Sequence, residues 1–150
     1  MVEPNFVNRV RLEVLHQASE TGRVPAAPEV ASHLGRPAGE VVEAFRELAE
    51  SHVYVLEPGD PTRLRMANPF SAVKTPFEVE VGGRQYFGNC AWDALGVVSL
   101  LGGEGRVRTG CPDCHEPMVL EVSARQLAPV DAVVHFAIPA RRWWDDIIHT

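Results

Sequence analysis

Residues 84–102, RQYFGNCAWDALGVVSLLG, are the stretch from which the fold of the second half can be read. From Ala91 onward the side chains are almost all apolar, and the run closes on glycines, which is typical of a helix end. We therefore expect a buried helix here. Cys90 stands at its N-terminal entrance, and Asp93 follows one turn later. A thiol beside a carboxylate at the start of an apolar helix needs a chemical explanation.

The segments on both sides of this helix have the patterns of antiparallel strands. FEVEVGGRQYFG (77–88) alternates apolar and acidic side chains before a Gly-Gly turn, as a β-hairpin does. RVRTGCPDCHEPMVLEVS (106–123) predicts two strands joined by a tight CPDC turn, and DAVVHFAIP (131–139) predicts another strand. ARRWWDDIIHT (140–150) predicts a short helix. Residues 77–150 are thus expected to form a small core that combines helices with an antiparallel sheet.

Residues 1–68 have a different, mainly helical pattern. Apolar residues recur with helical spacing in three segments. The helices are expected at residues 6–19, 25–35 and 36–52. VYVLEPGDPTRLRMA (53–67) then predicts two short strands around a turn, so the order predicts a winged-helix-like module. The expected fold class is α+β with two domains, 1–68 and 77–150, joined by a linker rich in turn formers.

The composition is that of a folded protein without a nucleic-acid or membrane signature. The 150 residues are 45% hydrophobic, which suffices for a core. Each half carries seven basic and ten acidic side chains. The third predicted helix carries Glu40, Glu43, Glu47 and Glu50 with only Arg46 among them, which disfavours DNA binding. No apolar run approaches the roughly 20 residues of a membrane span. Charged residues near the N-terminus lie where a secretory signal would have its apolar core, so we expect no such signal. We expect a cytoplasmic protein whose three cysteines are reduced.

Cys90 and Asp93 are the candidate catalytic pair. Unpaired N–H groups at a helix N-terminus stabilise a thiolate, whereas a neighbouring carboxylate raises the pKa of the thiol. The pair has a chemical explanation if the two groups together bind a soft cation or transfer a proton. The structural alternative is that Cys90 acts as a small buried hydrophobe and Asp93 satisfies backbone N–H groups at the helix start.

Cys111 and Cys114 form a second candidate site. Their C-x-x-C spacing is that of a zinc knuckle, but a closed zinc site needs four ligands and would have to recruit distant residues. A tight turn with one buried and one exposed thiol is the structural alternative. A redox dithiol is disfavoured because such motifs normally open a helix. The candidate metal ligands are therefore Cys90, Cys111 and Cys114, with zinc or copper at the last two.

The order of these features resembles the alkylmercury lyase family, the organomercurial lyases or MerB proteins. The similarity covers most of the chain and is strongest over residues 84–123, where C-A-x-D opens the helix. It implies a cytoplasmic enzyme that cleaves carbon-mercury bonds, with mercury as substrate and product and no cofactor required. Cys90 then matches the cysteine that binds mercury as thiolate, and Asp93 matches the acid that protonates the leaving carbon. Cys111 matches a structural cysteine, and Cys114 is an addition.

The chain departs from the family pattern because no counterpart of the family's second catalytic cysteine is found. We expect a C-terminally short core whose tail a homodimer partner would cover. The expected function is cleavage of an organomercurial by thiolate coordination and protonolysis. Two alternatives stay open: a non-catalytic relative that binds a soft metal ion or a mercurial, and a winged-helix regulator that responds to metal.

Overall fold

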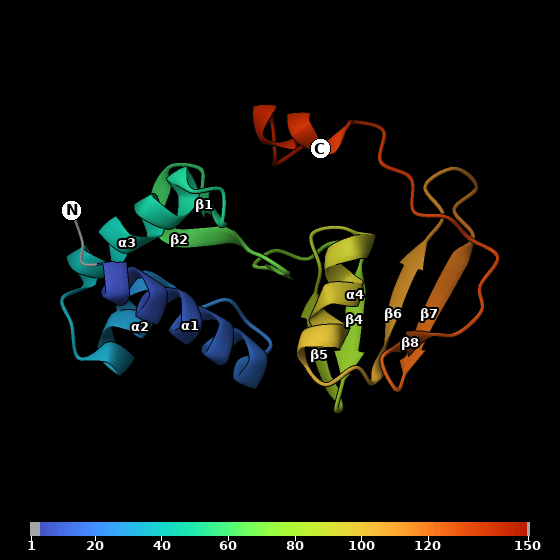
Figure 1. The fold of residues 1–150 in the computed structure, drawn as a ribbon, viewed down its shortest axis with the longest axis horizontal. Coiled ribbons are helices and arrows are strands. Elements are labelled where there is room, and N and C mark those ends of the chain that lie inside the picture. Colours follow the sequence, from blue (N-terminus) through green and yellow to red (C-terminus); the bar gives the residue numbers. More distant parts are fainter. Residues whose placement is uncertain (1–3, 150) are drawn as a thin grey trace.

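The computed structural model describes residues 4–149 and places a group of three helices beside a helix that covers a sheet (Figure 1). Of the residues, 37% are helical and 26% lie in strands, and every strand pairing is antiparallel. The predicted α+β class is therefore confirmed. Within this part of the chain, no helix combines the length and the apolar character needed to cross a membrane.

The three predicted N-terminal helices are all present. They are α1 (Pro4–Thr21), α2 (Ala27–Leu34) and α3 (Ala38–Glu50). The carboxylate of Glu29 caps the start of α2 by accepting from the Ala26 N–H at 2.8 Å. Gly35 ends α2 with φ at 62°, a left-handed conformation in which a residue without Cβ is favoured. Apolar residues of each helix point to a common core, as their spacing predicts.

A small antiparallel sheet in the order β1-β2-β3 follows the helices. Its strands are β1 (Tyr54–Glu57), β2 (Asp60–Ala67) and β3 (Phe70–Ser71). The hairpin β1-β2 was expected, whereas β3 lies in the segment predicted as a linker. Phe70 explains the difference, because its side chain is only 2% exposed and its backbone also forms a bridge to Gly88. The winged-helix assignment of this half stays a prediction.

The second half is a five-stranded antiparallel sheet in the order β5-β4-β6-β7-β8, with α4 (Ala91–Leu100) on one face (Figure 1). The strands are β4 (Glu78–Val81), β5 (Arg84–Phe87), β6 (Gly105–Gly110), β7 (Pro117–Ser123) and β8 (Gln126–Leu127). The helix buries Ala94, Val97 and Val98, but Trp92 is 67% exposed. The expectation of a buried helix is therefore right for one side of α4 only.

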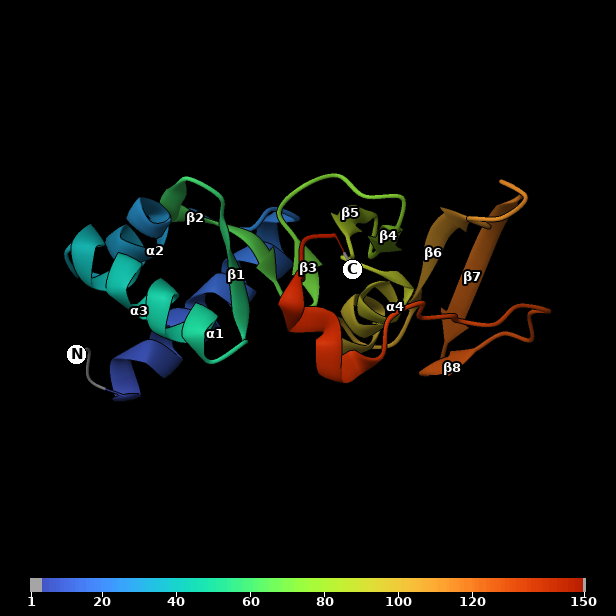
Figure 2. The ribbon, with the colours of Figure 1, turned by 90° about the horizontal axis from the view of Figure 1, so that it is seen from above.

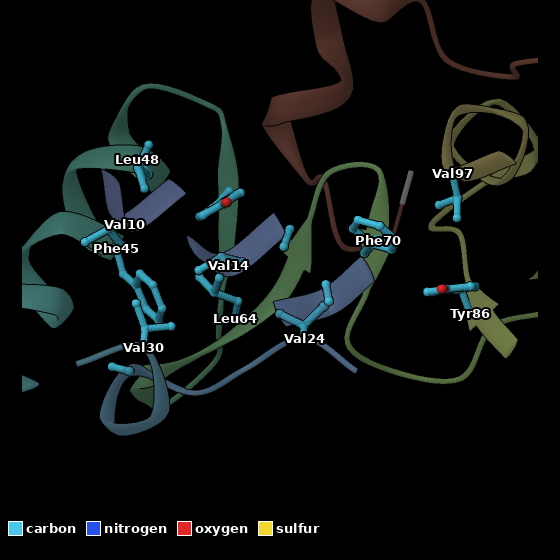
Figure 3. Packing of buried hydrophobic residues seen from close by; sticks show 14 of the residues in the cluster. Val10, Val14, Val24, Val30, Phe45, Leu48, Leu64, Phe70, Tyr86 and Val97 are labelled. Atoms are coloured by element: carbon cyan, nitrogen blue, oxygen red, sulfur yellow. The ribbon is translucent and has the colours of Figure 1, made fainter. Parts of the chain in front are cut away.

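One hydrophobic cluster runs through both halves (Figure 3). The ring of Phe70 lies 5.8 Å from the ring of Tyr86, between the core of the helices and Val97 of α4. The Tyr86 hydroxyl also donates to the Ser19 carbonyl at the end of α1, at 2.7 Å. The two halves are thus packed on each other, and the domain limits 1–68 and 77–150 stay a prediction.

The C-terminal segment does not form the strand predicted over residues 131–139. After β8 the chain is irregular, and Val133 is 90% exposed. Pro129 precedes this stretch and Pro139 ends it, and proline cannot donate a ladder hydrogen bond, which works against strand pairing. A 3-10 helix over Ala140–Asp145 follows, in agreement with the predicted short helix. Its Trp144 ring stacks on His52 at 4.2 Å, so the segment reaches back to the N-terminal half (Figure 2).

Candidate functional site

Cys90 is the N-cap residue of α4, the position that the sequence indicated. Its backbone is extended, with φ at −148° and ψ at −179°, and its Sγ accepts from the backbone N–H of Asp93 at 3.4 Å. The N–H of Trp92 is also directed at this sulfur. The thiol is half-buried. The helix therefore presents its free N–H groups to a sulfur that a small molecule could still reach.

Asp93 lies in the first turn of the same helix, so one peptide group links it to the sulfur. While its N–H donates to Cys90, its carboxylate Oδ2 accepts from the side-chain amide of Asn89 at 2.9 Å. The Asp93 side chain is half-buried. The structure thus brings the predicted catalytic pair together at the start of α4.

Asn89 is a residue that the sequence reasoning missed. Its amide also donates to Asn68 Oδ1 at 3.1 Å, which connects the site to the end of β2. Its own Oδ1 is buried and has no hydrogen-bond partner among residues 4–149. A polar residue between Gly88 and Cys90, directly ahead of an apolar helix, was the available signal. The absence of a side chain at Gly88 allows the chain before Asn89 to pack against α4, because a Cβ on Gly88 would lie 2.5 Å from the backbone nitrogen of Ala94.

Burial raises the pKa of both members of the pair. For Cys90 the loss of solvation dominates, the N–H of Asp93 opposes it, and the negative charge of Asp93 adds to it. For Asp93 the loss of solvation again dominates, and the hydrogen bond from Asn89 opposes it. Asp93 therefore holds its proton to a higher pH than an ordinary aspartate. An acid in this state can donate a proton, and a cation bound to the sulfur would favour the thiolate.

Cys111 and Cys114 lie in the turn between β6 and β7. Cys111 is half-buried and Cys114 is exposed. The pKa of Cys111 is lowered, chiefly because the backbone N–H groups of Cys114 and Asp113 are directed at its sulfur. Within residues 4–149 no group of three or more His, Cys, Asp or Glu side chains is arranged to hold a metal ion. The structure thus pairs two of the three predicted metal ligands and does not gather all three.

The opposite pKa shifts predict an order of alkylation. Because the thiolate is the nucleophile, Cys111 should react with iodoacetamide at a lower pH than Cys90. Reaction for short times over a pH series, followed by peptide mass spectrometry, measures both rates in one sample. In denaturant the difference should disappear, since both shifts come from the fold. Faster alkylation of Cys90 than of Cys111 at neutral pH would contradict the prediction.

These features define a class: an α+β protein that presents a thiol and an acid together at a helix start. A sequence model described as alkylmercury lyase (MerB) matches residues 70–150, which is more than half of the chain. The chain therefore belongs to the alkylmercury lyase family, as the resemblance in its sequence predicted.

A solved structure supports the same fold. The crystal structure of the mercury-bound form of MerB2 matches with a TM-score of 0.65 and 20% sequence identity. The match covers 85% of this chain and 60% of that one, so the chain spans less than two thirds of the MerB2 length. A search of curated protein sequences finds no match. At this identity the comparison with MerB2 concerns the fold alone.

Proposed function

We propose that the protein cleaves carbon-mercury bonds, with Cys90 as the thiolate that binds mercury and Asp93 as the proton donor. The observation that carries the proposal is the first turn of α4, where one peptide N–H joins the sulfur to the residue that bears the acid. Membership of the alkylmercury lyase family supports mercury as the substrate metal. A soft thiolate is also the ligand that a soft metal prefers.

The proposed reaction has two steps in which charge and protons balance. Cys90 displaces the small thiolate that lies opposite the organic group on mercury; a mercury-sulfur bond forms, and the displaced thiolate leaves with the proton of Cys90. Electron donation from sulfur weakens the bond between mercury and carbon. Asp93 then gives its proton to that carbon, which keeps the electron pair of the broken bond and leaves as a hydrocarbon. Hg(II) is then balanced by the Cys90 thiolate and the Asp93 carboxylate, until two free thiols bind it as thiolates and return their protons to Cys90 and Asp93.

The roles of the neighbouring residues follow from their contacts. The amide of Asn89 holds one oxygen of Asp93 and orients the carboxyl group. Trp92 follows Cys90 by two residues in the first turn of α4, and its exposed side chain would offer an apolar surface to the organic group of the substrate. Reduced thiols are required throughout, so the proposal places the reaction in the cytoplasm.

A second candidate is binding of a mercurial or soft metal ion without turnover. It is favoured by one observation: among residues 4–149, Cys90 is the only cysteine at the entrance of α4, and the other two lie in the β6-β7 turn. The regulator alternative is weaker, because the single arginine of α3, Arg46, is paired with Glu43 in the same helix. A homodimer that covers the exposed C-terminal segment also stays a prediction.

Incubation with phenylmercury and an excess of a monothiol tests the proposal. Benzene is measured by gas chromatography, and protein-bound mercury is measured after desalting. We expect benzene above the rate of the monothiol alone. Retained phenylmercury without benzene would overturn the lyase proposal and favour the binding function.

A further inference from the structure

We propose that the turn between β6 and β7 is a second soft-metal site, in which Cys111 and Cys114 together bind one Hg(II) ion. This inference rests on the geometry of the turn and does not require that the protein cleaves organomercurials. The mechanism proposed for Cys90 and Asp93 leaves both of these thiols unused.

Backbone hydrogen bonds fix the shape of this turn. The N–H of Cys111 donates to the Glu116 carbonyl at 3.0 Å, which continues the β6-β7 ladder by one pair. The N–H of His115 donates to the Cys111 carbonyl at 2.9 Å, and His115 has φ at 61°, in the left-handed region. These two bonds close the four residues between Cys111 and Glu116 into one tight loop. The loop is held by the sheet, so its thiols are pre-positioned.

The same loop brings the two sulfurs together. The bond from the His115 N–H to the Cys111 carbonyl closes the turn, so that Cys111 and Cys114 lie three residues apart within one tight loop. The backbone N–H groups of Cys114 and Asp113 lower the pKa of the Cys111 thiol. A pair of neighbouring sulfurs, one of them supported by N–H groups, is the donor set of a dithiolate. Cys114 is exposed, so an incoming metal complex can reach the pair.

The number of donors selects the ion. Zinc takes four ligands in structural sites, whereas Hg(II) is satisfied by two thiolates. In the described part of the chain these two thiols belong to no larger group of metal-binding side chains. The turn therefore suits a soft cation with low coordination number better than it suits zinc.

The binding step is an exchange of thiols. Hg(II) arrives as a complex with two small thiolates. Cys111 and Cys114 each lose a proton and form a mercury-sulfur bond, while each small thiolate leaves mercury and takes up one of those protons. Because the second bond forms within one chain, the dithiol should outcompete a monothiol by about 100-fold or more in affinity.

The turn lies at the same end of the second half as the entrance of α4 (Figure 1). The chain runs down α4 and returns along β6, so the end of β6 comes back to the level where the helix begins. Mercury released at the entrance of α4 would therefore have a dithiol acceptor at the same end of this half, set to the side beyond β6 (Figure 2). The second site could therefore accept the Hg(II) product, although it takes no part in the cleavage reaction.

The test uses the full chain in a Cys90→Ser background, which removes the other thiol. Reduced protein is mixed with mercury(II) chloride in an excess of 2-mercaptoethanol and passed through a gel-filtration column. Mercury per chain is measured by elemental analysis, and the mercury-thiolate absorption band is recorded. We expect one Hg(II) per monomer in Cys90→Ser. Adding Cys111→Ser or Cys114→Ser should lower retention about 100-fold or more.

Three results would overturn the proposal. They are no retention by Cys90→Ser, retention by either double variant that equals that of Cys90→Ser, and mercury found only in a species of twice the mass, which would mean a bridge between chains. Circular dichroism of each variant checks the fold, and Cys114→Ala provides a second substitution at the exposed position. The proposed lyase activity is measured on the unaltered chain, so failure of one proposal is distinguishable from failure of the other.

Discussion

Asp93→Asn is expected to lower the rate of carbon-mercury cleavage by about 100-fold or more while the protein still binds the organomercurial. A positioned general acid contributes a factor of this size or larger, and asparagine has no acidic proton to give. The substitution preserves shape, and the amide oxygen of asparagine can still accept from Asn89. The backbone N–H that reaches the Cys90 sulfur is unchanged.

Two measurements on the same sample separate chemistry from binding. Benzene release reports cleavage, and phenylmercury retained after desalting reports binding. The matched control is Asn89→Ala, which removes the hydrogen bond to Asp93 but leaves its acid in place. We expect Asn89→Ala to lose less activity than Asp93→Asn. Unaltered benzene release by Asp93→Asn would remove Asp93 from the mechanism.

The pH dependence follows from the raised pKa of Asp93. Its protonated form is the donor, so the protein stays able to donate at a pH where an ordinary aspartate is ionised. The raised pKa of Asp93 also makes the free energy of unfolding depend on pH. The folded state holds this proton more tightly than the unfolded state, so the contribution of Asp93 to stability falls as the pH rises between the two pKa values.

The sequence predicted the architecture well where periodicity was strong. The helices of both halves and the hairpins β1-β2 and β4-β5 were recognisable, because alternation or helical spacing of apolar residues directly reflects one buried face. The prediction placed Phe70 in a linker because its neighbours in the sequence are turn formers. The structure shows that the Phe70 side chain is buried in the core. The strand predicted over residues 131–139 is wrong for the opposite reason. Its apolar residues suit a strand, but β8 already pairs with the free edge of β7, and residues 131–139 do not join the sheet.

The residues of the candidate site could be predicted from their order in the sequence, but the hydrogen bonds between them could not. A cysteine followed by an aspartate at a helix start can be seen in the sequence, and so can the C-x-x-C turn. The hydrogen bond from Asn89 to Asp93 depends on how the end of β5 meets α4. The lowered pKa of Cys111 depends on N–H groups that only the folded turn directs at its sulfur. The folded backbone of the helix start and of the turn supplies these contacts, and residue spacing alone does not reveal them.

Cys90→Ser is expected to reduce carbon-mercury cleavage to the rate of the free monothiol and to abolish mercurial binding at α4. Serine replaces a soft sulfur by a hard oxygen, which is a poor ligand for mercury. Serine is also a favoured N-cap residue, so α4 should form normally and loss of activity would not reflect unfolding. This makes Cys90→Ser a cleaner test than an alanine substitution.

Binding at Cys90 has to be separated from binding at the β6-β7 turn. In a Cys111→Ser/Cys114→Ser background, Cys90 is the remaining thiol of the chain, and one phenylmercury per protein is expected. The triple serine variant should bind none. Asp93→Asn in the same background should bind phenylmercury but release little benzene, because the thiolate holds the metal and the acid breaks the bond. Cleavage that survives Cys90→Ser would show that another group binds the substrate, and the role assigned to the α4 entrance would be wrong.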